Sequence, residues 1–250
     1  ARSALRPLGR YLLPLLLAGL LGGLIGGLLL LASGDDVFSL LIPWLLLVAT
    51  ALLLAPVAGV AQDKDKDADK DKDGWISLFN GKNLDGWKIG DAKQGKWKVE
   101  KGSIVANGPR SHLFTIKEFK NFEFKAEVMT TPGSNSGIYF HTKYQAVGFP
   151  STGHETQVNV SQGDPVKTGS IYGVVKLYET PAKDNKWWEQ HIIVRGQNVV
   201  VKIDGKTVLD YTEPAGIKGT RKISSGSFAL QAHDPKSVTY YRNLRVKPLK

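Results

Sequence analysis

The chain has 250 residues, no cysteine, and a formal net charge of +10 at pH 7. The absence of cysteine excludes disulfides and cysteine catalysis, and it leaves the redox compartment open. The basic net charge alone does not indicate nucleic-acid binding, because a binding surface for nucleic acid requires basic residues clustered with exposed aromatics. Here the lysines are scattered along strand-like segments, as at Lys96, Lys98, Lys202 and Lys206. We therefore expect no nucleic-acid partner and interpret these lysines as a solvated sheet face.

Residues 1–61 are hydrophobic in two runs, 11–32 and 37–61, which are separated by a short polar segment. Each run is long enough to cross a hydrocarbon core of roughly 30 Å. Glycines in the first run form small-xxx-small pairs, which let helices approach closely in lipid. The sequence therefore predicts membrane or signal helices, and a protein that is membrane-anchored or exported.

The orientation of this end has two interpretations. Arg2, Arg6 and Arg10 precede the first run, as is typical of a cytoplasmic flank. A helical hairpin would then return the rest of the chain to the cytoplasm. In the other interpretation, 37–61 is a signal-type segment whose small residues at 58–61 suit cleavage. We favour the periplasmic or extracellular side and leave the orientation open.

The N-terminal region also contains Pro-Leu-Gly-Arg-Tyr-Leu-Leu-Pro at 7–14, a Leu/Gly-rich run, and Pro-Trp-Leu-Leu-Leu at 43–47. Residues 7–55 thereby resemble the late part of a TauE/SafE-type permease. The resemblance implies that the chain is a fusion or an assembly artefact, so the function of the N-terminal part need not be related to that of the rest. No transport activity is predicted from such a fragment.

Residues 62–74 form a charged segment in which Asp alternates with Lys through 63–73, except for Ala68. Such a segment buries too little apolar surface to offset its ordering entropy, so we predict a solvated linker. The alternative is a calcium loop, because the aspartate spacing and Gly74 match the start of an EF-hand. The twelfth position of that loop requires a bidentate Glu and is Asn80 here, which disfavours calcium.

From Trp75 to the C-terminus the apolar pattern alternates with a period of two. Phe122, Phe124, Ala126 and Val128 share one face of a predicted strand. Dipeptides such as Asp204-Gly205 signal hairpins between further strands. No window sustains a helical period, and short strands separated by turn residues are typical of a sandwich or barrel. We predict one all-β domain over 75–250, built from two packed antiparallel sheets.

Polar residues gather at 133–140, Gly-Ser-Asn-Ser-Gly-Ile-Tyr-Phe, directly after the predicted strand 122–129. Glu155 and Gln157 follow about one strand later. Small, amide and hydroxyl groups beside an acid and an amide suit a sugar pocket. We expect Asn135 and Ser136 to contact sugar hydroxyls, the alternative being that they only fix the turn.

A series of motifs runs from Trp75 to the C-terminus: 78–87 Leu-Phe-Asn-Gly-Lys-Asn-Leu-Asp-Gly-Trp, 97–102 Trp-Lys-Val-Glu-Lys-Gly, 135–137 Asn-Ser-Gly, Glu155, Gln157, 168–173 Thr-Gly-Ser-Ile-Tyr-Gly and 241–246 Tyr-Arg-Asn-Leu-Arg-Val. Together they resemble the 3-keto-disaccharide hydrolase family. The resemblance implies a concanavalin-A-like jelly-roll sandwich and cleavage of glycosides already oxidised at C3. One departure is His141, which stands where the family commonly has Arg.

The implied chemistry is elimination followed by hydration. A C3 ketone acidifies the C2 hydrogen, so a base can remove that proton, the C1 substituent can leave, and water can add afterwards. The route requires a base, a group that polarises the ketone, and an acid for the leaving oxygen. We expect Glu155 to be the base, and His141 and His233 to be candidates for the other two roles.

Gln157, Tyr172 and Trp188 are further candidate substrate contacts. Gln157 could bind a sugar hydroxyl, and the two aromatic residues could stack on a sugar face, although core packing is favoured for Trp188. No cofactor is firmly predicted. A divalent metal held by histidines would also polarise the ketone, but these histidines lack tight ligand spacing.

Two other functions fit the same residues: a non-catalytic carbohydrate-binding, lectin-like module, and an ordinary glycosidase, which would need paired acids. Glu155 separates the enzyme from the module, because only an enzyme requires its carboxylate. The expected partners are an oligosaccharide or glycoside substrate, a sugar 3-oxidoreductase acting upstream, and the membrane through the N-terminal segment.

Overall fold

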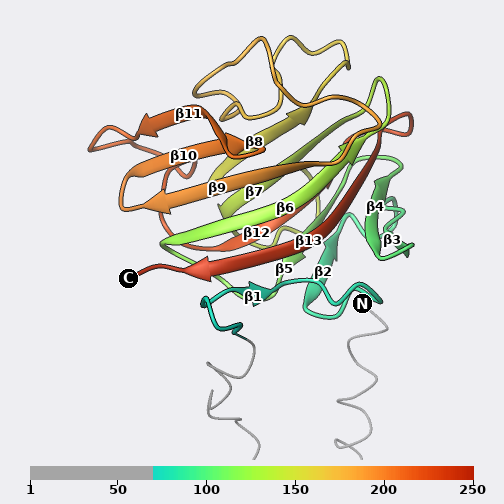
Figure 1. Ribbon diagram of the computed structural model, residues 1–250, viewed down its shortest axis with the longest axis horizontal. Coiled ribbons are helices and arrows are strands. Elements are labelled where there is room, and N and C mark those ends of the chain that lie inside the picture. The colour runs from blue at the N-terminus through green and yellow to red at the C-terminus, as the bar shows by residue number, and fades with distance from the viewer. Residues whose placement is uncertain (1–69) are drawn as a thin grey trace, which may run out of the picture. The chain divides into compact units, whose positions relative to one another are not determined.

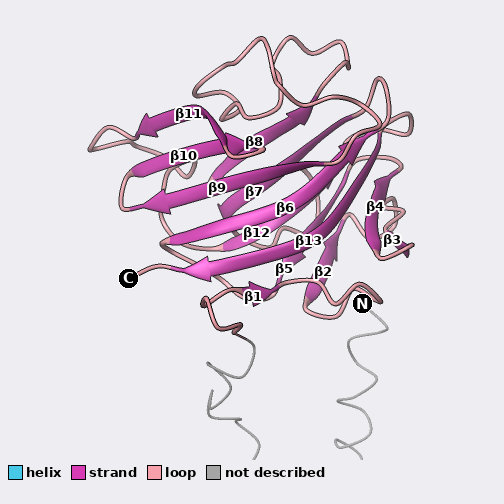
Figure 2. Cartoon of the chain, viewed as in Figure 1, coloured by secondary structure: helices cyan, strands magenta, loops and turns pink. Residues whose placement is uncertain are grey.

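The structure is a computed structural model that describes residues 70–250. The two hydrophobic runs, the permease-like region 7–55 and most of the charged linker lie outside the described residues. Within residues 70–250 the chain forms strands joined by turns and loops, without a helix (Figure 2). Accordingly, this part of the chain has no helix that is long and apolar enough to span a membrane. The predicted all-β class is confirmed.

Thirteen strands make up the described chain (Figure 1). In chain order they are β1 (Ile76–Ser77), β2 (Trp87–Gly90), β3 (Lys98–Glu100), β4 (Ser103–Asn107), β5 (Ser111–Thr115), β6 (Phe122–Thr130), β7 (Asn135–Thr142), β8 (His154–Asn159), β9 (Trp188–Arg195), β10 (Asn198–Ile203), β11 (Lys206–Thr212), β12 (Ser227–Ala232) and β13 (Val238–Pro248).

The strands form two antiparallel sheets. The large sheet has the order β11-β10-β9-β6-β13-β4-β3, with β1 also paired to β13. The small sheet has the order β2-β5-β12-β7-β8. Strands that are far apart in sequence are therefore neighbours in the sheet. For example, β5 pairs with β12, although six other strands lie between them in the chain. The two-sheet sandwich is confirmed, whereas its jelly-roll subtype stays a prediction.

The predicted hairpins form where turn residues accept a left-handed backbone. Lys101 and Gly102 join β3 to β4 with φ of 48° and 74°, and Asp204 and Gly205 join β10 to β11 with φ of 49° and 78°. Positive φ at both central residues is the requirement of the type I′ turn, whose twist matches that of the flanking strands. These turns set the register of the outer strands of the large sheet.

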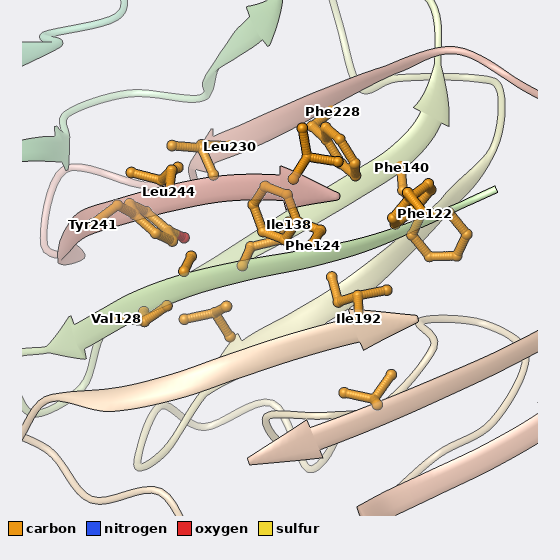
Figure 3. Close-up of a cluster of buried hydrophobic side chains, with 14 of the residues drawn as sticks. Phe122, Phe124, Val128, Ile138, Phe140, Ile192, Phe228, Leu230, Tyr241 and Leu244 are labelled. Atoms are coloured by element: carbon orange, nitrogen blue, oxygen red, sulfur yellow. The ribbon is translucent and has the colours of Figure 1, made fainter. Parts of the chain in front are cut away.

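The core lies between the sheets (Figure 3). Buried and half-buried residues alternate along β6, so Phe122, Phe124 and Val128 face the core. Phe228 of the small sheet meets them, with its ring centroid 4.7 Å from that of Phe122 and 4.4 Å from that of Phe124. Aromatic side chains from both sheets thus pack against one another across the core.

Strands β7 and β8 are buried along their whole length rather than at alternate residues. One face of the small sheet packs on the core, so its other face must also be covered. The segments 143–153, 160–187 and 213–226 contribute the residues that gather on that face (Phe149, Asp164, Tyr172 and Arg221). This second, loop-covered face holds the candidate site.

Candidate functional site

The outer face of the small sheet brings polar residues from three strands together. Tyr139 of β7 lies directly opposite Glu155 of β8, and Gly137 lies opposite Gln157. Opposed residues in an antiparallel pair project from the same face of the sheet. Residue Ala229 of β12 pairs with Tyr139, so Gln231, two residues on, shares that face as well.

These residues line a pocket with a volume of about 300 Å³. Its wall comprises sheet residues, namely Asn135, Tyr139, Glu155, Gln157 and Gln231, together with Phe149, Asp164, Tyr172, Arg221 and His233 from connecting segments. The mixture of amides, acids, one guanidinium and aromatic rings suits a hydroxylated ring better than an apolar ligand.

Glu155 is the most perturbed acid of the pocket. The residue is 5% exposed, and burial raises the pKa of its carboxyl to about 7. Hydrogen bonding from Tyr139 and the nearby charge of Arg221 oppose that rise, whereas Asp164 adds to it. A carboxyl with such a pKa can both take and release a proton near neutral pH.

Gly137 makes the space in which the Glu155 carboxyl lies. A Cβ atom at position 137 would overlap Oε1 of Glu155 and would approach its Cδ and Cγ within 2.8 and 2.9 Å. The glycine of the Asn-Ser-Gly motif thus has a physical role, because any side chain there would displace the acid.

Tyr139 links Gln231 to Glu155. The Gln231 amide donates Nε2–H to the Tyr139 hydroxyl oxygen at 3.0 Å. The Tyr139 hydroxyl therefore keeps its own proton for Glu155, with which it hydrogen bonds. Burial raises the pKa of Tyr139, and the neighbouring Glu155 raises it further, so the phenol stays a donor. This relay orients the carboxyl of Glu155.

Two amide oxygens of the pocket wall have no hydrogen-bond partner among the described residues: Asn135 Oδ1 and Gln231 Oε1. Buried acceptors are normally satisfied, so a site that leaves two of them free is suited to hydroxyl donors from a ligand. Two aromatic side chains, Phe149 and Tyr172, are 46% and 43% exposed and present ring surface at the pocket.

His233 is held by a neighbouring acid. Its Nδ1 lies 2.8 Å from Oδ2 of Asp234, which also accepts the Ser237 hydroxyl at 2.7 Å. Although burial acts in the opposite direction, the hydrogen bonds from Ser237 and His233 lower the pKa of Asp234. An acceptor at Nδ1 orients the imidazole and leaves Nε2 for exchange with a ligand.

Comparison with known proteins shows the family to which the domain belongs. The model described as the 3-keto-alpha-glucoside-1,2-lyase-like domain matches residues 74–247. The chain belongs to this family. A curated 3-keto-disaccharide hydrolase from Bacteroides thetaiotaomicron is 37% identical over 79 residues, which cover 27% of each chain. The alignment thus spans about a quarter of that relative.

Solved structures share the fold of this 3-keto-alpha-glucoside-1,2-lyase-like domain. One putative glycosyl hydrolase from Parabacteroides distasonis aligns with a TM-score of 0.61 and 24% identity, over 75% of this chain and 97% of that chain. A second from the same organism aligns with a TM-score of 0.56 and 22% identity, over 70% and 99%. At this level of identity the likeness shows the fold.

The structure brings five of the eight predicted site residues to the pocket of this lyase-like domain: Asn135, Glu155, Gln157, Tyr172 and His233. It does not bring the other three there. The hydroxyl of Ser136 bonds Tyr241 of the large sheet at 2.6 Å, so it points into the core. Trp188 is 2% exposed within the core, as the favoured interpretation had it.

His141 is the third predicted residue away from the pocket. Its Nε2 bonds the Lys120 carbonyl oxygen at 2.7 Å, and its Nδ1 accepts the Ser224 N–H at 3.0 Å. A carbonyl cannot donate, so Nε2 carries the proton and both ring nitrogens are engaged. Burial lowers the pKa of His141 to about 4, which keeps the ring neutral. We therefore do not retain it as a group that touches substrate.

A metal would need a cluster of ligands. Within residues 70–250 no group of three or more His, Asp or Glu side chains is arranged to hold one. In the calcium-like segment, the Asp71 carboxylate accepts the N–H groups of Asp73 and Trp75, each at 2.9 Å. It acts there as the acceptor of a local turn.

Five pocket residues were not predicted: Tyr139, Phe149, Asp164, Arg221 and Gln231. Tyr139 could have been found, because strand alternation puts it on the same face of β7 as the predicted Asn135. Gln231 could have been found too, because it lies two residues before the predicted His233. The other three lie in long connecting segments, whose path no local pattern reveals.

Proposed function

We propose that this domain cleaves 3-keto glycosides, with Glu155 as the base that removes the C2 proton. The observation that carries the proposal is a nearly buried carboxyl, with a pKa of about 7, in a pocket of about 300 Å³ rimmed by amides and aromatic rings. One sugar ring with part of its substituent fits such a volume. The family match supports the keto-sugar substrate.

The proposed reaction has two stages. Glu155 takes the C2 proton, the electrons of that C–H bond form a C1–C2 double bond, and the C1–O bond breaks. The leaving oxygen receives a proton from Nε2 of the His233 imidazolium, while Nδ1–H stays directed at Asp234. Water then adds across the double bond: its oxygen bonds C1, Glu155 returns its proton to C2, and His233 takes the proton that the water loses. The net change is hydrolysis.

Arg221 is the proposed electrostatic partner. Removing the C2 proton places negative charge on the C3 oxygen, and a cation at the pocket stabilises that charge. Arg221 lines the pocket and acts on Glu155 through its charge. Asn135 and Gln231 would accept hydrogen bonds from sugar hydroxyls through their unpaired amide oxygens.

An ordinary glycosidase is the second candidate, because the pocket holds a second carboxylate, Asp164. Its Oδ1 accepts the Val166 N–H at 2.8 Å and its Oδ2 faces the Tyr172 hydroxyl at 3.4 Å. An acid engaged in this way serves loop structure. Elimination needs one carboxylate as base, whereas a glycosidase needs two.

The decisive experiment offers the full chain an aryl 3-keto-glucoside and, in parallel, the unoxidised glucoside. We expect aglycone release from the keto sugar alone, and we expect Glu155→Gln to lower kcat by about 10²–10⁴-fold, the usual share of a general base. Asp164→Asn is the matched control and should retain most of the turnover.

Other outcomes of that experiment point elsewhere. Binding without turnover would identify a carbohydrate-binding module. Cleavage of the unoxidised glucoside, lost in both variants, would identify an ordinary glycosidase. Full turnover by Glu155→Gln would remove this residue from the base role.

The proposed substrate also has consequences for partners and location. Its ketone requires an oxidation at C3, so a sugar 3-oxidoreductase acting upstream is part of the proposal. Membrane anchoring or export through residues 1–61 remains a proposal from the sequence, with the periplasmic or extracellular side favoured.

A further inference from the structure

The segment 213–226, called here the Arg221 loop, connects β11 to β12 and carries Arg221 to the pocket. Arg221 donates from its terminal nitrogen to the Pro150 carbonyl at 2.9 Å, and the Thr220 hydroxyl donates to the Ser151 carbonyl at 2.7 Å. These bonds fix the tip of the loop against segment 143–153. Arg221 itself is exposed, so its position also depends on the residues that hold the base of the loop.

A buried hydrogen bond between His154 and Glu213 holds one part of the base. Nε2 of His154 lies 2.7 Å from Oε1 of Glu213, and the two side chains are 3% and 4% exposed. The second carboxylate oxygen of Glu213 accepts the Ile223 N–H at 2.8 Å. Glu213 thereby ties the start of the loop to the residue that lies two positions after Arg221.

His141 holds the next residue. It is 1% exposed, and its Nδ1 accepts the Ser224 N–H at 3.0 Å while its Nε2–H donates to the Lys120 carbonyl at 2.7 Å. The imidazole therefore bridges the Arg221 loop and the segment before β6. Ser224 is three residues from Arg221, so the bond restrains where the guanidinium can lie.

The backbone at His141 is built for this contact. Its φ is +54°, in the left-handed region. The register of β7 with β12 shifts here, since Thr142 pairs with Ser227 and Tyr139 pairs with Ala229. Two residues of β7 thus oppose one residue of β12, which is a bulge, and bulges re-aim a side chain. The bulge turns His141 away from the pocket and toward the loop.

We propose that His141 is a positioning residue: by accepting the Ser224 N–H, it holds the Arg221 loop so that the guanidinium of Arg221 faces Glu155. The consequence for catalysis rests on the proposed function, because Arg221 matters to turnover only if charge develops in this pocket. The consequence for Glu155 itself does not, since a nearby cation lowers the pKa of the carboxyl in the absence of any substrate.

The test is a double-mutant cycle on the full chain with His141→Phe, Arg221→Gln and the double variant. Phenylalanine keeps a ring but has no acceptor for Ser224. The first readout is the Glu155 pKa, from carboxyl NMR of ¹³C-Glu-labelled protein without substrate. We expect both single variants to raise it, and the double variant to raise it no further than Arg221→Gln, because the two residues act through one cation.

The second readout is turnover of the 3-keto-glucoside. We expect His141→Phe to lower kcat/KM at least about tenfold, as displaced electrostatic groups do, and to have no effect in the Arg221→Gln background. His141→Asn is the conservative control: Asn tolerates the left-handed backbone and its Oδ1 can accept the Ser224 N–H. It should restore wild-type values in both readouts.

Two results would overturn the proposal. One is a folded His141→Phe whose Glu155 pKa equals that of the wild type. The other is a shift in the double variant that equals the sum of the single shifts. If His141→Phe does not fold, Ser224→Pro removes the same hydrogen bond from an exposed position and takes its place. A chain that turns over neither sugar would end the proposed function, while the titration would still decide the role of His141.

Discussion

Opposing effects on a single carboxyl determine what Glu155 can do. Burial disfavours its charged form, whereas Tyr139 and Arg221 favour it, and the balance leaves the pKa at about 7. An acid on an exposed strand would be ionised at that pH and a poorer partner for a C–H proton, since proton transfer is most efficient when the catalytic pKa lies near the working pH. The placement of Glu155 thus matters as much as its identity.

The first prediction concerns the space beside this carboxyl. Gly137→Ala puts a methyl group where Oε1 of Glu155 lies, so the acid must move. We expect kcat/KM to fall by about 10²-fold, the cost of a misplaced catalytic group. Gly163→Ala is the control, because a Cβ there meets no atom within 4 Å. Equal activity in both variants would show that the position of Glu155 is not critical.

The second prediction follows from the pKa of Glu155. A general base works in its deprotonated form, so kcat/KM should rise with pH through about 7. Below that value the rate should fall about tenfold per pH unit. A pH–rate profile between 5.5 and 8.5 measures this. A flat profile over that range would mean that a group with this pKa does not limit the reaction.

At the scale of elements, the small sheet supplies the polar floor and the loops supply the walls. Phe149 belongs to segment 143–153, which Asp91, the residue after β2, holds in place. The Asp91 Oδ2 accepts the Gly148 N–H at 3.1 Å, and the Asp91 backbone N–H donates to the Ala146 carbonyl at 2.8 Å. Arg110 lies between Asp91 and Phe149. Its Nε is 3.7 Å from Oδ2 of Asp91, and its Cζ is 4.9 Å from the centre of the Phe149 ring.

The third prediction tests this support. Asp91→Asn weakens the acceptor for Gly148 and the attraction to Arg110, so the Phe149 wall should become mobile. We expect KM to rise about threefold to tenfold with little change in kcat, because a stacking wall binds substrate and transition state alike. Phe149→Ala should raise KM further. Asp85→Asn, at an exposed acid, is the control.

For the whole molecule, buried ionisable groups of the small sheet couple stability to pH in opposite directions. Burial lowers the pKa of His112 to about 3, and both of its ring nitrogens lack a hydrogen-bond partner in the described chain. The folded state therefore binds fewer protons at His112 than the unfolded state between pH 6.5 and 3, and stability falls as the pH falls through that window. Glu155, whose folded pKa is raised to about 7, does the reverse between pH 7 and 4.5.

The fourth prediction separates these contributions. His112 lies among the rings of Phe114, Tyr139 and Phe149, so His112→Phe fits an aromatic site. Glu155 is present in both chains and contributes equally to both. The change in unfolding free energy from pH 7 to pH 5 should therefore be about 2 kcal/mol less favourable for the wild type than for the variant. Urea unfolding of both chains at the two pH values measures the difference. Equal changes in both chains would mean that His112 is not kept neutral by the fold.

Much of the fold and part of the site could be predicted from residues that are close in sequence. Alternation placed Phe122, Phe124 and Val128 on one face, and that face is the core. The hairpin at Asp204-Gly205 formed because both positions adopt positive φ. The grouping of Asn135, Glu155 and Gln157 was predictable, since β7 and β8 are consecutive strands that pair.

His141 and Arg221 show where local pattern was insufficient. The alternation along β7 cannot indicate a bulge, so a histidine next to a site motif was expected to face the ligand. Arg221 reaches the pocket only because β12 returns beside β7, with its preceding loop held by Glu213 and His141. Nothing within the sequence around Arg221 distinguishes it from a surface arginine.

By itself, the sequence determined the all-β class, the core face of the long strand β6 and the hairpin turns, and it indicated Glu155 as the candidate acid of the site. These depend on steric and hydrophobic preferences that act over a few residues. Only the tertiary structure decided which loops close the pocket, how far burial moves the pKa of Glu155, and that His141 bonds the Arg221 loop instead of lining the pocket. Those properties depend on groups that are far apart in the chain, because dielectric environment and charge proximity arise only when the two sheets and their long connections come together.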